Sequence, residues 1–345
     1  MYFTLEPKKE KKDFFNYNYE YGELKKALHD GEHIVAIIGV RRVGKTSLLN
    51  IVYNEIKQIK VWIDGRIIND PKREIFSAIY EVAKSGKSKI FGKIDSLNIS
   101  AFGFGMDVKV GPQSTLEMER KISSAGSIKV FIDEAQRMDP LKLADILSYF
   151  YDRVPNVSFI ISGSELGLVE EILGEYDAEH PLYGRHIVKI RMERLDKNNA
   201  MDFLMGGFSQ TDTKIRAAEI NEAIKELDGL IGWLTLFGHE RGVLKNRDAL
   251  NKTIEIAKSI AGSELVHFLK KSKNRKIYLA ILHNAHGIRW TELRLVCGRE
   301  LEKLPNPSVF SFALERLATY SFIEKINDKY YVADPLTFKA SLSVH

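Results

Sequence analysis

Residues 37–49 read IIGVRRVGKTSLL and contain the Walker A spacing G-x-x-x-x-G-K-[ST]. The glycines allow the backbone to wrap closely around a phosphate, and the N–H groups that open the following helix point at it. The motif's lysine can reach β- and γ-phosphates, and the hydroxyl after it can ligate Mg²⁺. We therefore predict a nucleotide phosphate site with a catalytic Lys45 and a metal-binding Thr46. The expected nucleotide contacts are Gly39, Arg41, Arg42, Val43, Gly44, Lys45, Thr46 and Ser47.

Arg41 and Arg42 occupy variable positions of this loop, so the motif itself assigns them no role. Exposed arginines are commonly solvated side chains whose ion pairs contribute little. Alternatively, their planar and permanently charged groups contact a phosphate or a partner domain. The sequence leaves both alternatives open.

A second stretch, residues 128–134, reads IKVFIDE and is typical of an apolar strand that ends in two carboxylates, the Walker B pattern. Asp133 can hold Mg²⁺ through water, and Glu134 can orient and deprotonate an attacking water. Acidic residues also favour the start of a helix, which is the alternative explanation. After a phosphate loop, the pair favours hydrolysis of a nucleoside triphosphate over transfer to a metabolite.

A third polar strand end lies in residues 157–164, VSFIISGS. If this strand lies between the two Walker strands, Ser162 is in a position to sense the γ-phosphate and take part in catalysis. Two serines after a strand are equally a common turn signal.

Five apolar segments alternate with helical patterns along the first part of the chain, which predicts a parallel α/β sheet with flanking helices. The segments are 32–39, 59–64, 128–134, 157–164 and 186–191. Ligands of such sheets bind at the carboxyl ends of the strands. The polar residues described above should therefore converge there.

Changes in sequence pattern suggest three parts. Residues 1–194 are expected to hold a short lead-in and the α/β core, with a β-hairpin inserted at 88–113. Residues 195–262 read as a helical lid domain. Residues 263–345 suggest three helices and a two-stranded wing around Asn327 and Asp328, a winged helix-turn-helix pattern.

The overall composition excludes several other classes of protein. The 51 basic and 46 acidic residues give a net charge of +5, too mild to indicate a nucleic-acid binder by itself. The single cysteine, Cys297, excludes an internal disulfide framework and a multi-cysteine zinc site. It fits a reducing cytoplasm, where we expect the protein. No apolar run approaches the length of a membrane span.

Together, the segments GVRRVGKTSLL, VFIDEAQ, IISGSELGLVEEIL and PLYGR, followed by a winged-helix pattern, resemble the archaeal ATPase family. That family is similar to AAA+ and STAND ATPases. The resemblance implies ATP or ADP with Mg²⁺ as the ligands. It also makes Arg185, in PLYGR, the candidate for an arginine finger or phosphate sensor, with a surface ion pair as its alternative role. We expect the PLYGR loop on the carboxyl side of the sheet, near the γ-phosphate or facing a neighbouring subunit. STAND relatives usually carry a proline near the adenine, where this chain has Ile231.

The expected activity is Mg²⁺-dependent hydrolysis of ATP, coupled to domain rearrangement or to binding of a protein partner or a second copy. A nucleotide-gated DNA-binding switch is the alternative, and a scaffold that binds ATP without cleaving it is a weaker one. The presumed recognition helix, PSVFSFALERLATYSF, has Arg316 as its only basic residue, whereas DNA phosphate contacts need several. DNA is therefore not the favoured partner.

Overall fold

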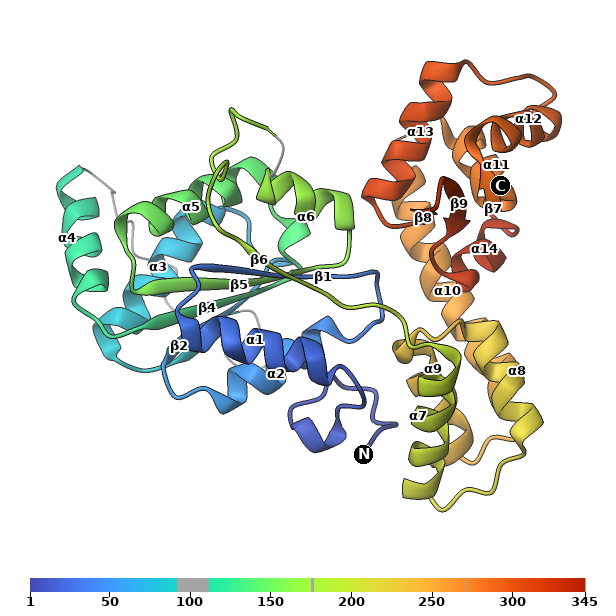
Figure 1. The fold of residues 1–345 in the computed structure, drawn as a ribbon, viewed down its shortest axis with the longest axis horizontal. Helices are drawn as coiled ribbons and strands as arrows, with labels where there is room; N and C mark the ends of the chain where they lie inside the picture. Colours follow the sequence, from blue (N-terminus) through green and yellow to red (C-terminus); the bar gives the residue numbers. More distant parts are fainter. Residues whose placement is uncertain (92–111, 175–176, 271, 345) are drawn as a thin grey trace.

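The computed structural model describes residues 1–91, 112–174, 177–270 and 272–344. Figure 1 shows an α/β core on one side of the molecule and two smaller helical groups on the other. We call α7 to α10 the helical region and the elements from α11 onward the C-terminal region. The long helix α10 (Ala249–Leu269) connects the two.

The core is built on a six-stranded parallel sheet in the order β3-β2-β4-β5-β1-β6. Its strands are β1 (Ile34–Ile38), β2 (Ile59–Asp64), β3 (Lys89–Phe91), β4 (Ile128–Asp133), β5 (Val157–Gly163) and β6 (Val188–Arg191). The strand β5 pairs with both β1 and β4, so it lies between the two Walker strands, the condition under which Ser162 is in a position to sense the γ-phosphate. Strands buried on both faces explain the continuous apolar runs in the sequence.

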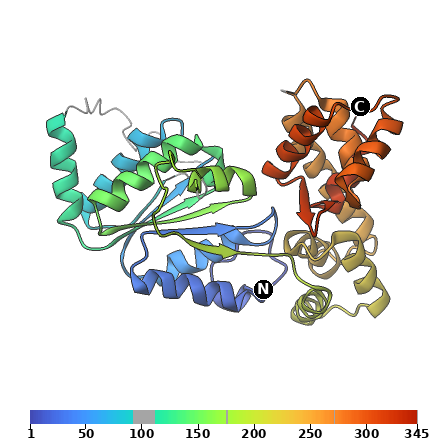
Figure 2. The same ribbon diagram turned by 45° about the horizontal axis from the view of Figure 1, so that its top comes forward.

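Helices cover both faces of this sheet (Figure 2). One face packs against α1 (Asn18–Asp30) and α2 (Lys45–Glu55). The other packs against α3 (Pro71–Ser85), α5 (Pro140–Arg153) and α6 (Leu166–Leu173), with α4 (Pro112–Ser123) beside α3. Proline at the first position of α3 and of α5, each after an aspartate cap, fixes where these helices begin.

The helical region contains α7 (Lys197–Gln210), α8 (Ala217–Leu227), α9 (Ile231–Gly238), a π-helical turn at His239–Val243 and then α10. Phe3 from the start of the chain is fully buried in this region, where its ring packs edge-on against Phe203 and Phe208. The first residues of the chain therefore tie the helical region to the core.

The C-terminal region contains four helices and a three-stranded antiparallel sheet in the order β7-β9-β8. Its elements are α11 (Arg275–Asn284), β7 (His286–Arg289), α12 (Trp290–Glu300), α13 (Pro307–Thr319), β8 (Ile323–Ile326), β9 (Lys329–Val332) and α14 (Pro335–Ser341). Both turn residues of the β8–β9 hairpin, Asn327 and Asp328, have positive φ angles, as a two-residue hairpin turn requires. The arrangement is compatible with a winged helix. The strand β7 and the helix α14 were not expected from the sequence.

The hairpin expected at 88–113 falls largely on residues 92–111, outside the described part of the chain. Its first residues, Lys89–Phe91, form β3, which pairs with β2 in parallel and lies at the edge of the main sheet. These residues extend the main sheet, and the hairpin itself stays a prediction. Across the described residues, no helix is both long and apolar enough to cross a membrane.

Candidate nucleotide site

The phosphate loop connects the end of β1 at Ile38 to the start of α2 at Lys45. Gly44 has a φ of +98°, a conformation that other residues rarely adopt. A Cβ atom on Gly39 would lie 2.3 Å from the backbone oxygen of Met192. Both glycines of the motif are therefore needed for the path of the chain.

Lys45 points back into this loop and is only 6% exposed. Its Nζ donates hydrogen bonds to the backbone oxygens of Gly39 at 2.8 Å and of Val40 at 2.7 Å. Burial lowers the pKa of Lys45 to about 8, against the opposing effect of the nearby carboxylates Glu134 and Asp133. The ammonium thus lies where phosphate oxygens could replace the two carbonyls as acceptors.

Three residues predicted from separate motifs meet at the carboxyl edge of the sheet. Thr46 donates from Oγ1 to Asp133 Oδ2 at 3.0 Å, and Ser162 donates from its hydroxyl to Asp133 Oδ1. Burial raises the pKa of the Asp133 carboxyl, and the hydrogen bonds from Ser162 and Thr46 oppose that rise. Hydroxyl and carboxylate oxygens are the ligands that Mg²⁺ prefers, so this cluster fits the metal in chemistry.

Glu134 directly follows β4 and has a φ of +55°. Its Oε2 accepts a 2.6 Å hydrogen bond from Nε2 of Gln136, which is buried. Gln136 was not among the predicted site residues, although it stands in the VFIDEAQ segment. Its contact with Glu134 arises from the short 3₁₀ turn at Ala135–Arg137, which the sequence pattern did not reveal.

A second pair of residues that the motifs did not indicate lies at the end of β2. Asp64 pairs in register with Asp133 on the neighbouring strand. Arg66 donates to both oxygens of Asp64, from Nε to Oδ1 at 2.9 Å and from Nη2 to Oδ2 at 2.6 Å. This ion pair therefore lies beside the Walker B residues.

Arg41 and Arg42 contact other parts of the chain. Arg41 pairs with Glu165 at the start of α6 and donates at 3.0 Å to the backbone oxygen of Tyr320. Arg42 donates at 2.8 Å to Glu264 on α10 and lies 3.4 Å from Asp334, the N-cap of α14. Of the alternatives left open by the sequence, this geometry favours contact with another domain.

Val43 and Ser47, the last two predicted nucleotide contacts, also contact neighbouring parts of the protein. Val43 is fully buried in the core, and the hydroxyl of Ser47 accepts a 3.0 Å hydrogen bond from the backbone N–H of Lys8. The N-terminal segment therefore lies against the first turn of α2.

Arg185 lies at the opposite end of the sheet. It precedes β6, which runs parallel to β1, so it lies where the strands begin, whereas the phosphate loop lies where β1 ends. Its Nη2 donates to Asp152 in the last turn of α5 at 2.6 Å. The expectation that this loop lies on the carboxyl side of the sheet is wrong, because the loop enters a strand instead of leaving one.

Ile231 begins α9 and lies near Gly44, together with Phe14 and Met192. The backbone N–H of Gly232 also donates to the backbone oxygen of Arg42 at 2.9 Å. Ile231 therefore occupies the first position of a helix, which also suits proline. Isoleucine supplies an apolar wall beside the loop, of the kind that a nucleobase can pack against.

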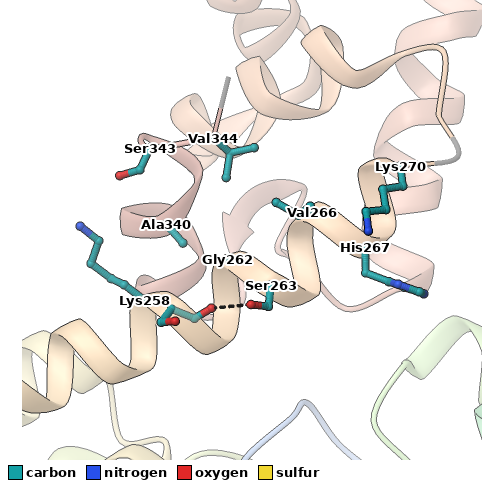
Figure 3. Close-up of a pocket in the computed structure, with 10 residues that line it drawn as sticks. Lys258, Gly262, Ser263, Val266, His267, Lys270, Ala340, Ser343 and Val344 are labelled. Carbon is teal, nitrogen blue, oxygen red and sulfur yellow. Dashed lines mark hydrogen bonds between the residues drawn. The ribbon is translucent and has the colours of Figure 1, made fainter.

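A separate cavity of about 570 Å³ lies between α10 and α14 (Figure 3). It is lined by small side chains and by Lys258, His267 and Lys270. Figure 3 shows these basic groups spread along α10, with no carboxylate among the residues drawn. None of the residues predicted from the motifs lines it.

A family model matches more than half of the chain. The family described as an ATPase domain predominantly from Archaea matches residues 14–237. A Walker-type ATPase of Pyrococcus abyssi is similar to this chain at 27% identity, with a TM-score of 0.78 over 99% of this chain and 100% of its own.

Two further solved structures resemble the chain more distantly, and both TM-scores are below 0.5. The RuvB Holliday junction branch migration motor of Thermotoga maritima has 15% identity and a TM-score of 0.46, covering 95% of this chain and 96% of its own. The AMPPCP-bound DnaA of Aquifex aeolicus has 16% identity and a TM-score of 0.42, covering 92% and 93%. The comparison with curated protein sequences gives no match.

Proposed function

Because the chain belongs to the family of predominantly archaeal ATPases, we propose that it binds ATP and hydrolyses it to ADP and phosphate with Mg²⁺. The observation that carries this proposal is the meeting of Thr46, Asp133 and Ser162 at the carboxyl edge of the sheet, directly beside the phosphate loop. Three segments far apart in sequence supply these groups.

In this proposal the phosphates lie against the N-terminus of α2, where backbone N–H groups and the Lys45 ammonium replace lost hydration. Thr46 and Asp133 would hold Mg²⁺, which neutralises charge on the phosphate oxygens when bound. Ser162 donates to Asp133 and so keeps one carboxylate oxygen in a fixed orientation. The protein's own contribution is to position these charges before the reaction.

Glu134 is the proposed general base. It accepts the proton of a water molecule as that water attacks the γ-phosphorus, the bond from phosphorus to the bridging oxygen breaks, and ADP leaves. Its place next to Asp133 puts the carboxylate beside the metal-binding group. A scaffold that only binds ATP has no need of such a base.

We further propose that the nucleotide state is coupled to the position of the C-terminal region. Arg41 and Arg42 belong to the phosphate loop, yet Arg42 pairs with Asp334 in the C-terminal region and with Glu264 on α10. Arg41 donates to the backbone oxygen of Tyr320 in the same C-terminal region. A bound triphosphate brings competing negative charge to the same loop, so it weakens these ion pairs and favours separation of the C-terminal region.

DNA binding through α13 remains the less favoured function. The outward residues of this helix include Phe312, Glu315 and Arg316, so a single cation is flanked by an acid and a large apolar side chain. On the wing, Lys325 already pairs with Asp328 at 2.8 Å. Several unpaired cations would be expected on a surface that binds DNA phosphates.

Two further proposals concern the location of the protein and its partners. The single cysteine, Cys297, is a buried free thiol, which fits the reducing cytoplasm that we propose as its location. A protein partner or second copy is proposed because Arg185 cannot reach its own phosphate loop from the amino edge of the sheet. If it acts as an arginine finger, it must do so on a neighbouring subunit.

The decisive experiment compares Glu134→Gln with the wild type in ATP binding and in phosphate release. We expect turnover to fall about 10²–10⁴-fold while ATP affinity changes less than about twofold, because only the base is removed. Glu171→Gln, on the exposed face of α6, is the matched control. Chelation of Mg²⁺ should stop turnover reversibly. Hydrolysis at the wild-type rate by Glu134→Gln would remove the assigned base.

A further inference from the structure

Gln136 connects the ends of the two central strands, β4 and β5. Its side chain is 5% exposed and makes three hydrogen bonds. Nε2 donates to Glu134 Oε2 at 2.6 Å and to Ser164 Oγ at 3.0 Å, and Oε1 accepts from the backbone N–H of Ser164 at 3.3 Å. A buried amide with all of these partners has little freedom to rotate.

The contacts determine which way the amide faces. The backbone N–H of Ser164 can only donate, so the carbonyl oxygen of Gln136 must lie on that side. The NH₂ group is then turned toward Glu134 and the hydroxyl of Ser164. The glutamate carboxylate therefore always meets a donor, and a flipped amide would place two acceptors against each other.

The surrounding backbone is adapted to this contact. A Cβ atom on Gly163 would lie 2.9 Å from Oε1 of Gln136 and 2.2 Å from a methyl group of Val169, so only glycine leaves the amide its place. Glu134 itself has a left-handed backbone conformation, which is uncommon outside glycine. Such strain persists where surrounding contacts hold it, and Gln136 supplies one of them.

We propose that Gln136 is a positioning residue for hydrolysis, one that holds Oε2 of Glu134 so that Oε1 faces the attacking water. This inference rests on the proposed role of Glu134 as general base. Gln136 contacts neither water nor phosphate in this role and acts only through the glutamate. Ser164 assists by fixing the orientation of the amide.

The residue after Ser164 contacts one of the phosphate-loop arginines. Ser164 is followed by Glu165, whose side chain is 4% exposed and pairs with Arg41, which in turn donates to the backbone oxygen of Tyr320. Arg41, which contacts Tyr320 in the C-terminal region, is therefore paired with the residue next to Ser164.

The test is a double-mutant cycle with ATP turnover and ATP binding as separate readouts. Gln136→Met keeps the approximate volume and removes the donor, and Gln136→Glu keeps the shape and places an acceptor against Glu134. Each is made alone and on the Glu134→Gln background. Gln58→Met, at an exposed position between α2 and β2, is the matched control.

We expect either Gln136 variant to lower kcat about 10–100-fold with ATP affinity unchanged within about twofold. On the Glu134→Gln background the same change should cost less than about twofold, because a residue that acts through the glutamate has nothing left to position. Ser164→Ala should lower kcat by a smaller factor. It also provides a second variant should the Gln136 variants fold poorly.

A purely structural role gives a different result. Equal losses on both backgrounds, or a loss of ATP binding that parallels the loss of kcat, would overturn the inference. Wild-type turnover in the Gln136 variants, together with an inactive Glu134→Gln, would overturn only the positioning role of Gln136 and leave the proposed function standing. Wild-type turnover in Glu134→Gln would overturn both.

Discussion

The two sides of the phosphate loop make contacts of different kinds. Lys45 and Thr46 turn toward the sheet edge and meet groups from the loop itself and from β4. Arg41 and Arg42, only a few residues earlier, turn toward side chains more than a hundred positions away in sequence. One short loop thus carries both the expected chemistry and the contact with the rest of the molecule.

The energetics of the two sides also differ. Lys45 is buried without a carboxylate in direct contact, and burial lowers its pKa to about 8. The arginines lie opposite carboxylates whose pKa is raised by burial and held down by the guanidinium groups, as at Glu165 and Asp334. A phosphate would improve the surroundings of Lys45, whereas it competes with existing partners of the arginines.

Replacement of Lys45 should have the largest effect on the ligand side of the loop. Lys45→Ala removes a buried charge from the phosphates and should weaken ATP binding by about 10²–10³-fold or more. The fold should persist, because both hydrogen bonds of the Lys45 ammonium go to backbone oxygens of the loop itself. Equilibrium binding of a fluorescent ATP analogue measures the loss, with circular dichroism as the control. Binding at wild-type affinity would remove the phosphate-loop assignment.

Replacement of Arg42 should weaken the contact between the phosphate loop and the C-terminal region. Arg42→Ala leaves the buried Asp334 without its cation and leaves Glu264 with only the more distant Arg41, so separation of the C-terminal region should become about 10–100-fold more frequent. Hydrogen exchange across α14 is the measurement, and Arg299→Ala, at an exposed position on α12, is the control. Unchanged exchange in the Arg42 variant would mean that these ion pairs do not hold the region in place.

The pH dependence of ATP binding tests the charge of Lys45 on the ligand side of the loop. With a pKa of about 8, Lys45 is charged below that pH and increasingly neutral above it. Phosphate binding favours the charged form. Affinity should therefore be greatest below pH 8 and fall about tenfold between pH 7 and pH 9. Calorimetric titration at several pH values is the measurement. A flat profile would show that Lys45 is fully charged in the free protein.

Arg185 should give the smallest effect at its own site. Because it pairs with Asp152 at the amino edge of the sheet, Arg185→Ala should change turnover of an isolated subunit less than about tenfold. A true arginine finger contributes about 10³-fold or more. If it acts in trans, wild-type specific activity should rise with protein concentration, and a mixture of Arg185→Ala with Lys45→Ala should regain activity.

Sequence patterns predicted most of the ligand side of the loop. Walker spacing is local, and the carboxyl ends of parallel strands converge by geometry, so Thr46, Asp133 and Ser162 could be brought together in advance. Gln136 was missed because its role depends on a single irregular turn after β4. Periodicity does not report such turns.

The other side of the loop could not be predicted in the same way. The contact of Arg42 with Glu264 joins residues 222 positions apart, and no spacing rule reaches that far. Arg185 was placed at the wrong end of the sheet because the whole connection between β5 and β6 was assigned to the carboxyl edge, whereas its last residues lie at the amino edge, where β6 begins. In both cases the missing information was the relative placement of elements, which depends on tertiary packing.

Trp233 gives the contact between the phosphate loop and the C-terminal region an optical signal. The guanidinium of Arg42 lies 4.1 Å from the centre of the Trp233 ring, and the indole N–H of Trp233 donates to Asp334 at 2.9 Å. The chain has three tryptophans, so replacing Trp62 and Trp290 by phenylalanine leaves a single emitter at this contact. A buried indole beside a cation emits at a different wavelength and intensity from one in water. Stopped-flow fluorescence can therefore follow the opening of this contact in real time without an added dye.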